Sequence, residues 1–217
     1  YRCSMTVNID RTDPKVIIGV GDSTTSEDDS YTGINQDSVS VWGMQVEAGS
    51  FATSYIPTTT AAVTRAVDVV SADLTLNAEE YSMYIHCISP AIGAATGTWA
   101  VLYNDSNDYI DIQSYTSDIT TILAKGGTTQ VAATIESSYT QGVEDRVAIS
   151  LKENDYAGVL DGGTVVTDVS CLLPDLPTLI YIGSNAGSNA FINSHIKHAA
   201  VFNVALSDAD LQTITTG

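Results

Sequence analysis

Short stretches in which apolar and polar residues alternate run through the chain from about residue 80 to its end. Gly, Asn, Asp and Ser, which favour turns, separate them. Alternation with a period of two is typical of strands that bury one face. The pattern predicts ten strands, at residues 81–88, 98–103, 109–115, 119–124, 130–135, 146–152, 156–160, 165–169, 179–182 and 195–202. Strands at this spacing indicate a β-sandwich or barrel.

One short helix is expected after the last strand. Ser207 is placed to cap it, and Asp208 and Asp210 fall in its first turn, where the helix dipole favours negative charge. Leu206, Leu211 and Ile214 give it an apolar face. The chain has no glycine-rich nucleotide motif after a strand and no long amphipathic helix, which argues against an α/β enzyme fold.

The first part of the chain is organised differently. Residues 1–9, 15–20 and 38–47 each predict a strand, and a Pro/Thr/Ala-rich linker follows. Three strands cannot close a jelly roll, which needs about eight. We therefore expect another chain, a symmetry mate or the second domain to complete this part. We also expect the chain to be a piece of a longer protein, because it opens with Tyr1 inside a strand-like run.

Composition narrows the classes of partner. Hydrophobic residues make up 44% of the chain and charged residues 16%, and the formal net charge is -18. Such a chain repels the phosphate backbone, so nucleic acid is excluded as a partner. An anionic membrane surface is disfavoured for the same reason, and no apolar run is long enough for membrane insertion.

The segment VWGMQVEAGSFATSYIPT at 41–58, followed by TRAVD at 64–68, carries a first resemblance. It resembles the pattern that closes a carbohydrate-binding-module-like jelly roll in many phage structural and tail proteins. Met44 and Val46 stand where that pattern more often has Ala and Leu. The resemblance implies that Trp42 and Phe51 fill the core of such a domain.

Three further segments carry a second resemblance: VAISLKENDYAGVLDGG at 147–163, LIYIGS at 179–184 and IKHAAVFNVALSDADL at 196–211. They resemble the concanavalin A-like/laminin-G superfamily. Together the resemblances imply an all-β chain, with a concanavalin A-like (laminin-G-like) β-sandwich or jelly roll preceded by a partial jelly-roll segment. The implied domains are 1–57, the C-terminal part of a carbohydrate-binding-module-like jelly roll, a linker at 58–68, and the sandwich at 69–217.

The resemblances imply a non-catalytic carbohydrate-binding and structural module of a phage virion. It would belong to a tail fibre, spike or other appendage and contact host surface polysaccharide. Other virion chains are expected partners, and a homo-oligomer is expected, with a trimer as one form. Two alternatives stay open: an assembly module that binds no sugar, and the accessory module of a polysaccharide-degrading enzyme.

Sugar sites combine aromatic side chains with a few placed polar groups. One candidate group surrounds the turn at 104–108 and the other lies on a Gly/Ser/Asn loop. The candidate carbohydrate-binding residues are Trp99, Tyr103, Asn104, Asp108 and Tyr109 in the first group, and Asn185 and Asn189 in the second. Tyr115 is a further aromatic of the first group. Core packing is the alternative explanation for each aromatic.

Oxygen-rich turns suggest calcium as the one cofactor to consider. The candidate ligands are Asp105, Asn107 and Asp108, and a second acidic stretch holds Asp22, Glu27, Asp28 and Asp29. A solvated turn is the alternative for both. The chain lacks the paired-acid motif of sandwich-fold glycosidases, and the nearest approaches to it are Glu79-Glu80 and the stretch 108–111. No catalytic residue is therefore expected.

Three cysteines, Cys3, Cys87 and Cys171, stand far apart in the sequence. No CxxC pair is present, so a zinc site is not expected. Buried thiols are the main interpretation, and a bridge between Cys87 and Cys171 is the alternative.

Overall fold

In this computed structural model the described residues are 3–5, 7, 40–47, 52, 54–64, 68–90, 96–187, 190–192 and 194–217. The chain divides into two units, Tyr1–Arg65 and Ala66–Gly217. The division falls inside the segment expected to be a linker, residues 58–68. No helix among the described residues is long and apolar enough to cross a membrane.

In the first unit, residues 40–47 are not in a strand, so the predicted strand 38–47 is wrong over them. Gln45 instead accepts a hydrogen bond from the backbone N–H of Ile56 at 2.8 Å. Trp42 meets Tyr55 edge to face, with ring centroids 5.9 Å apart. Trp42 is 84% exposed, which contradicts its expected place in a core. Residues 3–5 and 7 are not in a strand either.

The other predictions for this unit, the strand 15–20, the acidic stretch from Asp22 to Asp29 and the packing of Phe51, lie outside the described residues.

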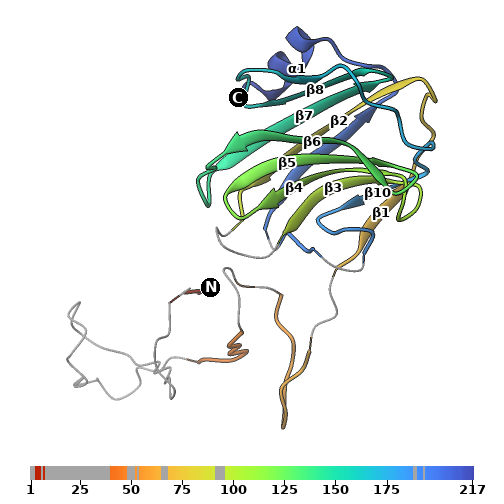
Figure 1. The fold of residues 1–217 in the computed structure, drawn as a ribbon. Helices are drawn as coiled ribbons and strands as arrows, with labels where there is room; N and C mark the ends of the chain where they lie inside the picture. Colours follow the sequence, from red (N-terminus) through yellow and green to blue (C-terminus); the bar gives the residue numbers. More distant parts are fainter. Residues whose placement is uncertain are drawn as a thin grey trace, which may run out of the picture. The chain divides into compact units, whose positions relative to one another are not determined.

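The second unit is built from two antiparallel sheets (Figure 1). The six-stranded sheet has the order β1-β10-β3-β4-β5-β6, and the five-stranded sheet has the order β11-β2-β7-β8-β9. The strands are β1 (Val70–Asp73), β2 (Glu80–Ile88), β3 (Gly97–Tyr103), β4 (Tyr109–Tyr115), β5 (Asp118–Lys125), β6 (Thr128–Ser137), β7 (Glu144–Lys152), β8 (Asp155–Leu160), β9 (Val166–Asp168), β10 (Leu179–Ile182) and β11 (Ile196–Phe202).

The ten strands predicted from the alternation match β2 to β11, within two residues at each end. Strand β1 was not predicted. All four of its residues are exposed, so it has no buried positions to produce an alternating pattern. It forms because its backbone pairs with β10, with Val70 opposite Ile182 and Asp73 opposite Leu179.

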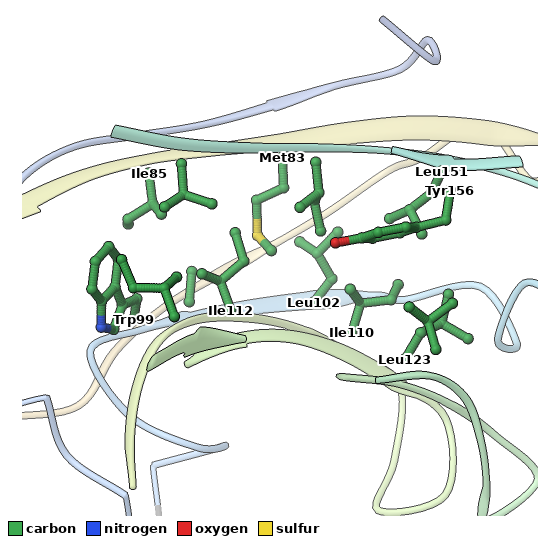
Figure 2. Close-up of a cluster of buried hydrophobic side chains, with 14 of the residues drawn as sticks. Met83, Ile85, Trp99, Leu102, Ile110, Ile112, Leu123, Leu151 and Tyr156 are labelled. Carbon is green, nitrogen blue, oxygen red and sulfur yellow. The ribbon is translucent and has the colours of Figure 1, made fainter. Parts of the chain in front are cut away.

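The core lies between the two sheets (Figure 2). Alternate residues of each strand point into it, and the residues between them face outward. The five-stranded sheet contributes Met83, Ile85, Leu151 and Tyr156, and the six-stranded sheet contributes Trp99, Leu102, Ile110, Ile112 and Leu123, all fully buried.

Helix α1 (Asp208–Thr215) covers part of the outer face of the five-stranded sheet, over β7 and β8. Its Leu211 is buried with Ala148 and Val159. Ser207 caps the helix and its hydroxyl accepts from the backbone N–H of Asp210 at 3.3 Å, which confirms the predicted cap. The outer face of the six-stranded sheet carries no helix of the described chain.

Candidate functional site

The outer face of the six-stranded sheet gathers tyrosines around a carboxylate. Tyr103 lies directly opposite Tyr109 across β3 and β4. Val101 lies opposite both Asp111 on β4 and Tyr181 on β10. Residues directly opposite one another share a face of the sheet. We call the set Tyr103, Tyr109, Asp111, Gln113 and Tyr181 the tyrosine face.

Two of the tyrosines touch. The rings of Tyr103 and Tyr181 meet edge to face, with centroids 5.8 Å apart and 85° between the ring planes. Both side chains are half-buried. Aromatic pairs favour this geometry, which holds one ring edge against the face of the other. The pair therefore offers a partly exposed aromatic surface on this face of the sheet.

Asp111 lies in the middle of β4, with only 3% of its surface exposed. Among the described residues its Oδ1 has no hydrogen-bond partner. Burial raises the pKa of Asp111 to about 7, against a smaller opposing effect of the backbone N–H of Ile122. Burial, followed by the carboxylate of Asp111, also raises the pKa of Tyr109. A buried polar atom without a partner costs about 1–3 kcal/mol, so Asp111 is a costly residue at this position of the sheet.

The turn at 104–108 borders the tyrosine face. The carboxylate of Asp108 accepts from the backbone N–H of Gly126 at 3.2 Å and from that of Asp175 at 2.9 Å. It thereby ties the β3–β4 turn to the β5–β6 turn and to the segment before β10. Because both backbone N–H groups are held by its carboxylate, we assign Asp108 the role of a support for the loops rather than a sugar contact. This corrects its assignment as a binding residue.

The calcium candidates are mostly engaged with backbone N–H groups. Asp105 Oδ1 accepts from Asn107 at 2.7 Å and from Asp108 at 3.1 Å. The described residues contain no group of three or more His, Cys, Asp or Glu side chains that could hold a metal ion. Asp105 Oδ2 and the side-chain oxygen of Asn107 remain as oxygen ligands at this turn, and calcium binding here stays a prediction.

Trp99 is not part of any surface. Its side chain is fully buried in the core, so its assignment as a sugar-stacking residue is wrong. Tyr103 and Tyr109, in contrast, lie together on the outer face as described. Asn104 is half-buried in the turn. Tyr115 is 56% exposed at the far end of β4.

The second candidate group begins beside Tyr181. Gly187 lies beside it, since an added Cβ atom would be in ordinary van der Waals contact with Tyr181 Cε1, at 3.7 Å. The loop that carries the half-buried Asn185 therefore lies at the edge of the tyrosine face. Asn189 lies outside the described residues. Tyr181 thus connects the two groups that the sequence suggested separately.

The two acids of the stretch 108–111 differ in their surroundings. Asp108 is held in its turn by backbone groups, whereas Asp111 faces outward from the middle of β4. The cysteines are free: Cys87 and Cys171 are buried thiols and Cys3 is exposed. The alternative of a Cys87–Cys171 bridge is wrong. Burial raises the pKa of both buried thiols, which makes them poor nucleophiles.

Tyr181, Asp111 and Gln113 were not predicted as residues of a binding surface, and Asp111 entered only as the end of the acidic stretch 108–111. The alternation in 109–115 contained the signal for two of them, because Ile110 and Ile112 point inward and residues 111 and 113 must then point outward. Tyr181 gave no such signal, since the four residues of β10 form one apolar run.

The fold is a β-sandwich of two antiparallel sheets, of the concanavalin A-like or jelly-roll type. No family model matches the chain, and no curated protein does. Solved structures match its fold. One is the IT-sialidase CBM40 of Ruminococcus gnavus bound to α2,3-sialyllactose, with a TM-score of 0.53 and 16% identity over 64% of this chain and 84% of the other.

A second is the binding domain of botulinum neurotoxin serotype G, with a TM-score of 0.55 and 9% identity over 67% of this chain and 39% of the other. A third is domain 4 of an extracellular arabinanase from Geobacillus stearothermophilus, in complex with arabinotriose. It has a TM-score of 0.52 and 13% identity over 66% of this chain and 69% of the other. At these identities the similarity establishes the fold alone, which is the fold class that the sequence predicted.

Proposed function

We propose that the second unit is a non-catalytic carbohydrate-binding module and that the tyrosine face is its sugar site. The observation that carries the proposal is the Tyr103–Tyr181 pair on the same outer face as the buried Asp111. The fold is shared with structures solved with sialyllactose and with arabinotriose, which supports a saccharide as the ligand.

The chemistry of the face suits a sugar ring. The C–H groups of a sugar pack on tyrosine rings, and its hydroxyls donate to and accept from polar side chains beside them. The half-buried Tyr103, Tyr109 and Gln113 present hydroxyl and amide groups that can both donate and accept. The face has no arginine or lysine among its named residues, so a neutral saccharide fits it better than an acidic one.

We also propose that the module belongs to a phage virion, in a tail fibre, spike or other appendage, where it contacts host surface polysaccharide. The support is the sequence of residues 41–68, which resembles the closing segment of phage tail domains. Exposed apolar side chains in that segment, including Trp42 at 84% and Val46 at 79%, would suit contact with other virion chains in a homo-oligomer.

The second candidate function is the accessory binding module of a polysaccharide-degrading enzyme. It is favoured by the fold similarity to a sialidase module and to an arabinanase domain. The two candidate functions share the tyrosine face as sugar site and differ in the larger protein or particle to which the module belongs.

A glycan microarray probed with the full chain tests the sugar site. We expect a small set of neutral glycans to bind, and the signals to disappear for Tyr103→Ala. Tyr115→Ala is the matched control, because Tyr115 is exposed at the far end of the same strand, and it should bind like the wild type. A wild-type chain that binds no glycan at high density would favour a purely structural module instead.

A further inference from the structure

A cluster of basic side chains lies on the opposite side of the sandwich from the tyrosine face. On the outer face of the five-stranded sheet, His198 on β11 lies directly opposite His86 on β2, and His86 lies directly opposite Arg146 on β7. The three side chains therefore form a row across three adjacent strands. Lys197 sits beside His198 at an irregularity in the β11–β2 register. We call these four residues the basic row.

Neighbouring side chains hold the row in place. Glu144 receives a hydrogen bond from Lys197 and lies 3.1 Å from His86 Nε2. These two contacts lower the pKa of Glu144, that with Lys197 most. The ring of Tyr84 packs edge to face on His198, with centroids 5.5 Å apart. Positions that are fixed in this way cost little further ordering when a ligand binds.

The basic row is distinctive because the chain is so acidic, with a formal net charge of -18. Unit 2 has only four basic residues, Lys125, Arg146, Lys152 and Lys197. Lys125 is already engaged in a hydrogen bond within the unit, because its Nζ donates to the carbonyl of Leu173 at 2.8 Å. Two of the remaining three lie in the row, together with two histidines.

The row already has contacts of its own, and the side chain of Arg146 hydrogen-bonds to that of Tyr84. Glu144 is shared between Lys197 and His86, as described. The carboxylate of Asp161 accepts the backbone N–H of Arg146 at 2.9 Å. Gly217 lies beside the guanidinium, since an added Cβ atom there would be 2.9 Å from Nη1. The guanidinium and ammonium groups only donate hydrogen bonds, and the imidazole of His198 offers at least one N–H, whereas His86 already faces Glu144 with its Nε2.

From this row of donors we infer a second binding site, which takes an oxyanion: the carboxylate or sulfate group of an acidic saccharide. Arg146 supplies the planar fork that binds such groups with two parallel hydrogen bonds. Adjacent strands are about 4.8 Å apart, so the row spans about 10 Å, which is enough for one charged sugar unit. The site is on the other sheet from the tyrosine face and does not depend on the function proposed for that face.

Titration of the full chain with sodium sulfate, followed by amide and side-chain NMR, tests the inference. Sodium chloride at matched ionic strength is the reference, because it removes general screening effects. We expect saturable shifts at His86, Arg146 and His198 with sulfate alone. Arg146→Gln and His198→Gln should each weaken binding about tenfold. Lys152→Gln, which removes a positive charge from the far end of β7, should leave binding unchanged.

A sulfated and a carboxylated oligosaccharide then separate the two kinds of acidic group, with a neutral oligosaccharide as the blank. Either acidic one should bind at the row and keep its affinity in Tyr181→Ala, which independently disables the tyrosine face. His198 is exposed, so its variant should keep the wild-type melting temperature. Any of three results would overturn the inference. The shifts could follow ionic strength alone, Lys152→Gln could weaken binding as much as Arg146→Gln does, or sulfate could bind while neither acidic oligosaccharide does.

Discussion

The ring of Tyr181 stands edge-on to the ring of Tyr103, across neighbouring strands that are far apart in the sequence. This contact makes each ring the support of the other. If a sugar packs on the pair, removal of the Tyr181 ring should weaken binding about tenfold, or about 1.4 kcal/mol. Tyr181→Phe keeps the ring contact and should lose no more than about half of that free energy. Calorimetry with a microarray hit measures both, and equal affinity in wild type and Tyr181→Ala would speak against the pair.

Asp111 should make stability depend on pH. An aspartate in an unfolded chain has a pKa of about 3.9, and burial raises that of Asp111 to about 7 in the folded state. Between these values the folded state holds a proton that the unfolded state has released. The contribution of this group is therefore fully present below about pH 4 and is lost as the pH rises to about 7.

Asparagine does not titrate, so the unfolding free energy of Asp111→Asn lacks this pH-dependent contribution. Relative to this variant, the wild type should lose up to about 4 kcal/mol of unfolding free energy between pH 4 and pH 8. Urea midpoints across this range measure the difference. Asp73→Asn, at an exposed aspartate of the same sheet, is the control and should follow the wild type. Parallel curves for wild type and Asp111→Asn would mean that the carboxyl is not buried as described.

Asp108 should matter for stability more than for binding. Its carboxylate accepts from two backbone N–H groups that belong to different segments. Asp108→Ala leaves both donors without a partner and should cost about 2–4 kcal/mol. Thermal melts measure the loss. Asp105→Ala, at an exposed turn position, should cost less than half as much, and a larger effect at position 105 would contradict the structural role given to Asp108.

Trp99 and Trp42 should differ in their access to solvent. Trp99 is fully buried and Trp42 is 84% exposed. In Trp42→Phe the remaining tryptophan emission should be blue-shifted and resistant to iodide quenching. In Trp99→Phe the emission should be red-shifted and readily quenched. If iodide quenched Trp42→Phe as strongly as free tryptophan, Trp99 would have to be exposed, which would contradict its burial in the core.

The sequence predicted the strands well because one face of nearly every strand is buried, which imposes a period of two. It misplaced Trp99 for a local reason. The register of β3 on β4 shifts between Thr98 and Ala100, so Trp99 is the extra residue of a bulge. Simple alternation from Val101 and Tyr103 would turn residue 99 outward, whereas the bulge turns it into the core.

The sites depend on pairings that are not local in sequence. Tyr103 and Tyr181 come together because β10 inserts beside β3, and His86 meets Arg146 and His198 because β2 lies between β7 and β11. Alternation predicts which side of its own strand a residue occupies. It does not predict which strands become neighbours, so neither the tyrosine face nor the basic row could be assembled from the sequence.

The most direct test of the sugar site is an NMR map of a neutral glycan selected on the microarray. We expect saturable amide shifts in β3, β4 and β10, with the largest at Tyr103, Asp111 and Tyr181, and none at the basic row. Saturable shifts confined to β2, β7 and β11, or no shifts at saturating glycan, would contradict the proposed sugar site.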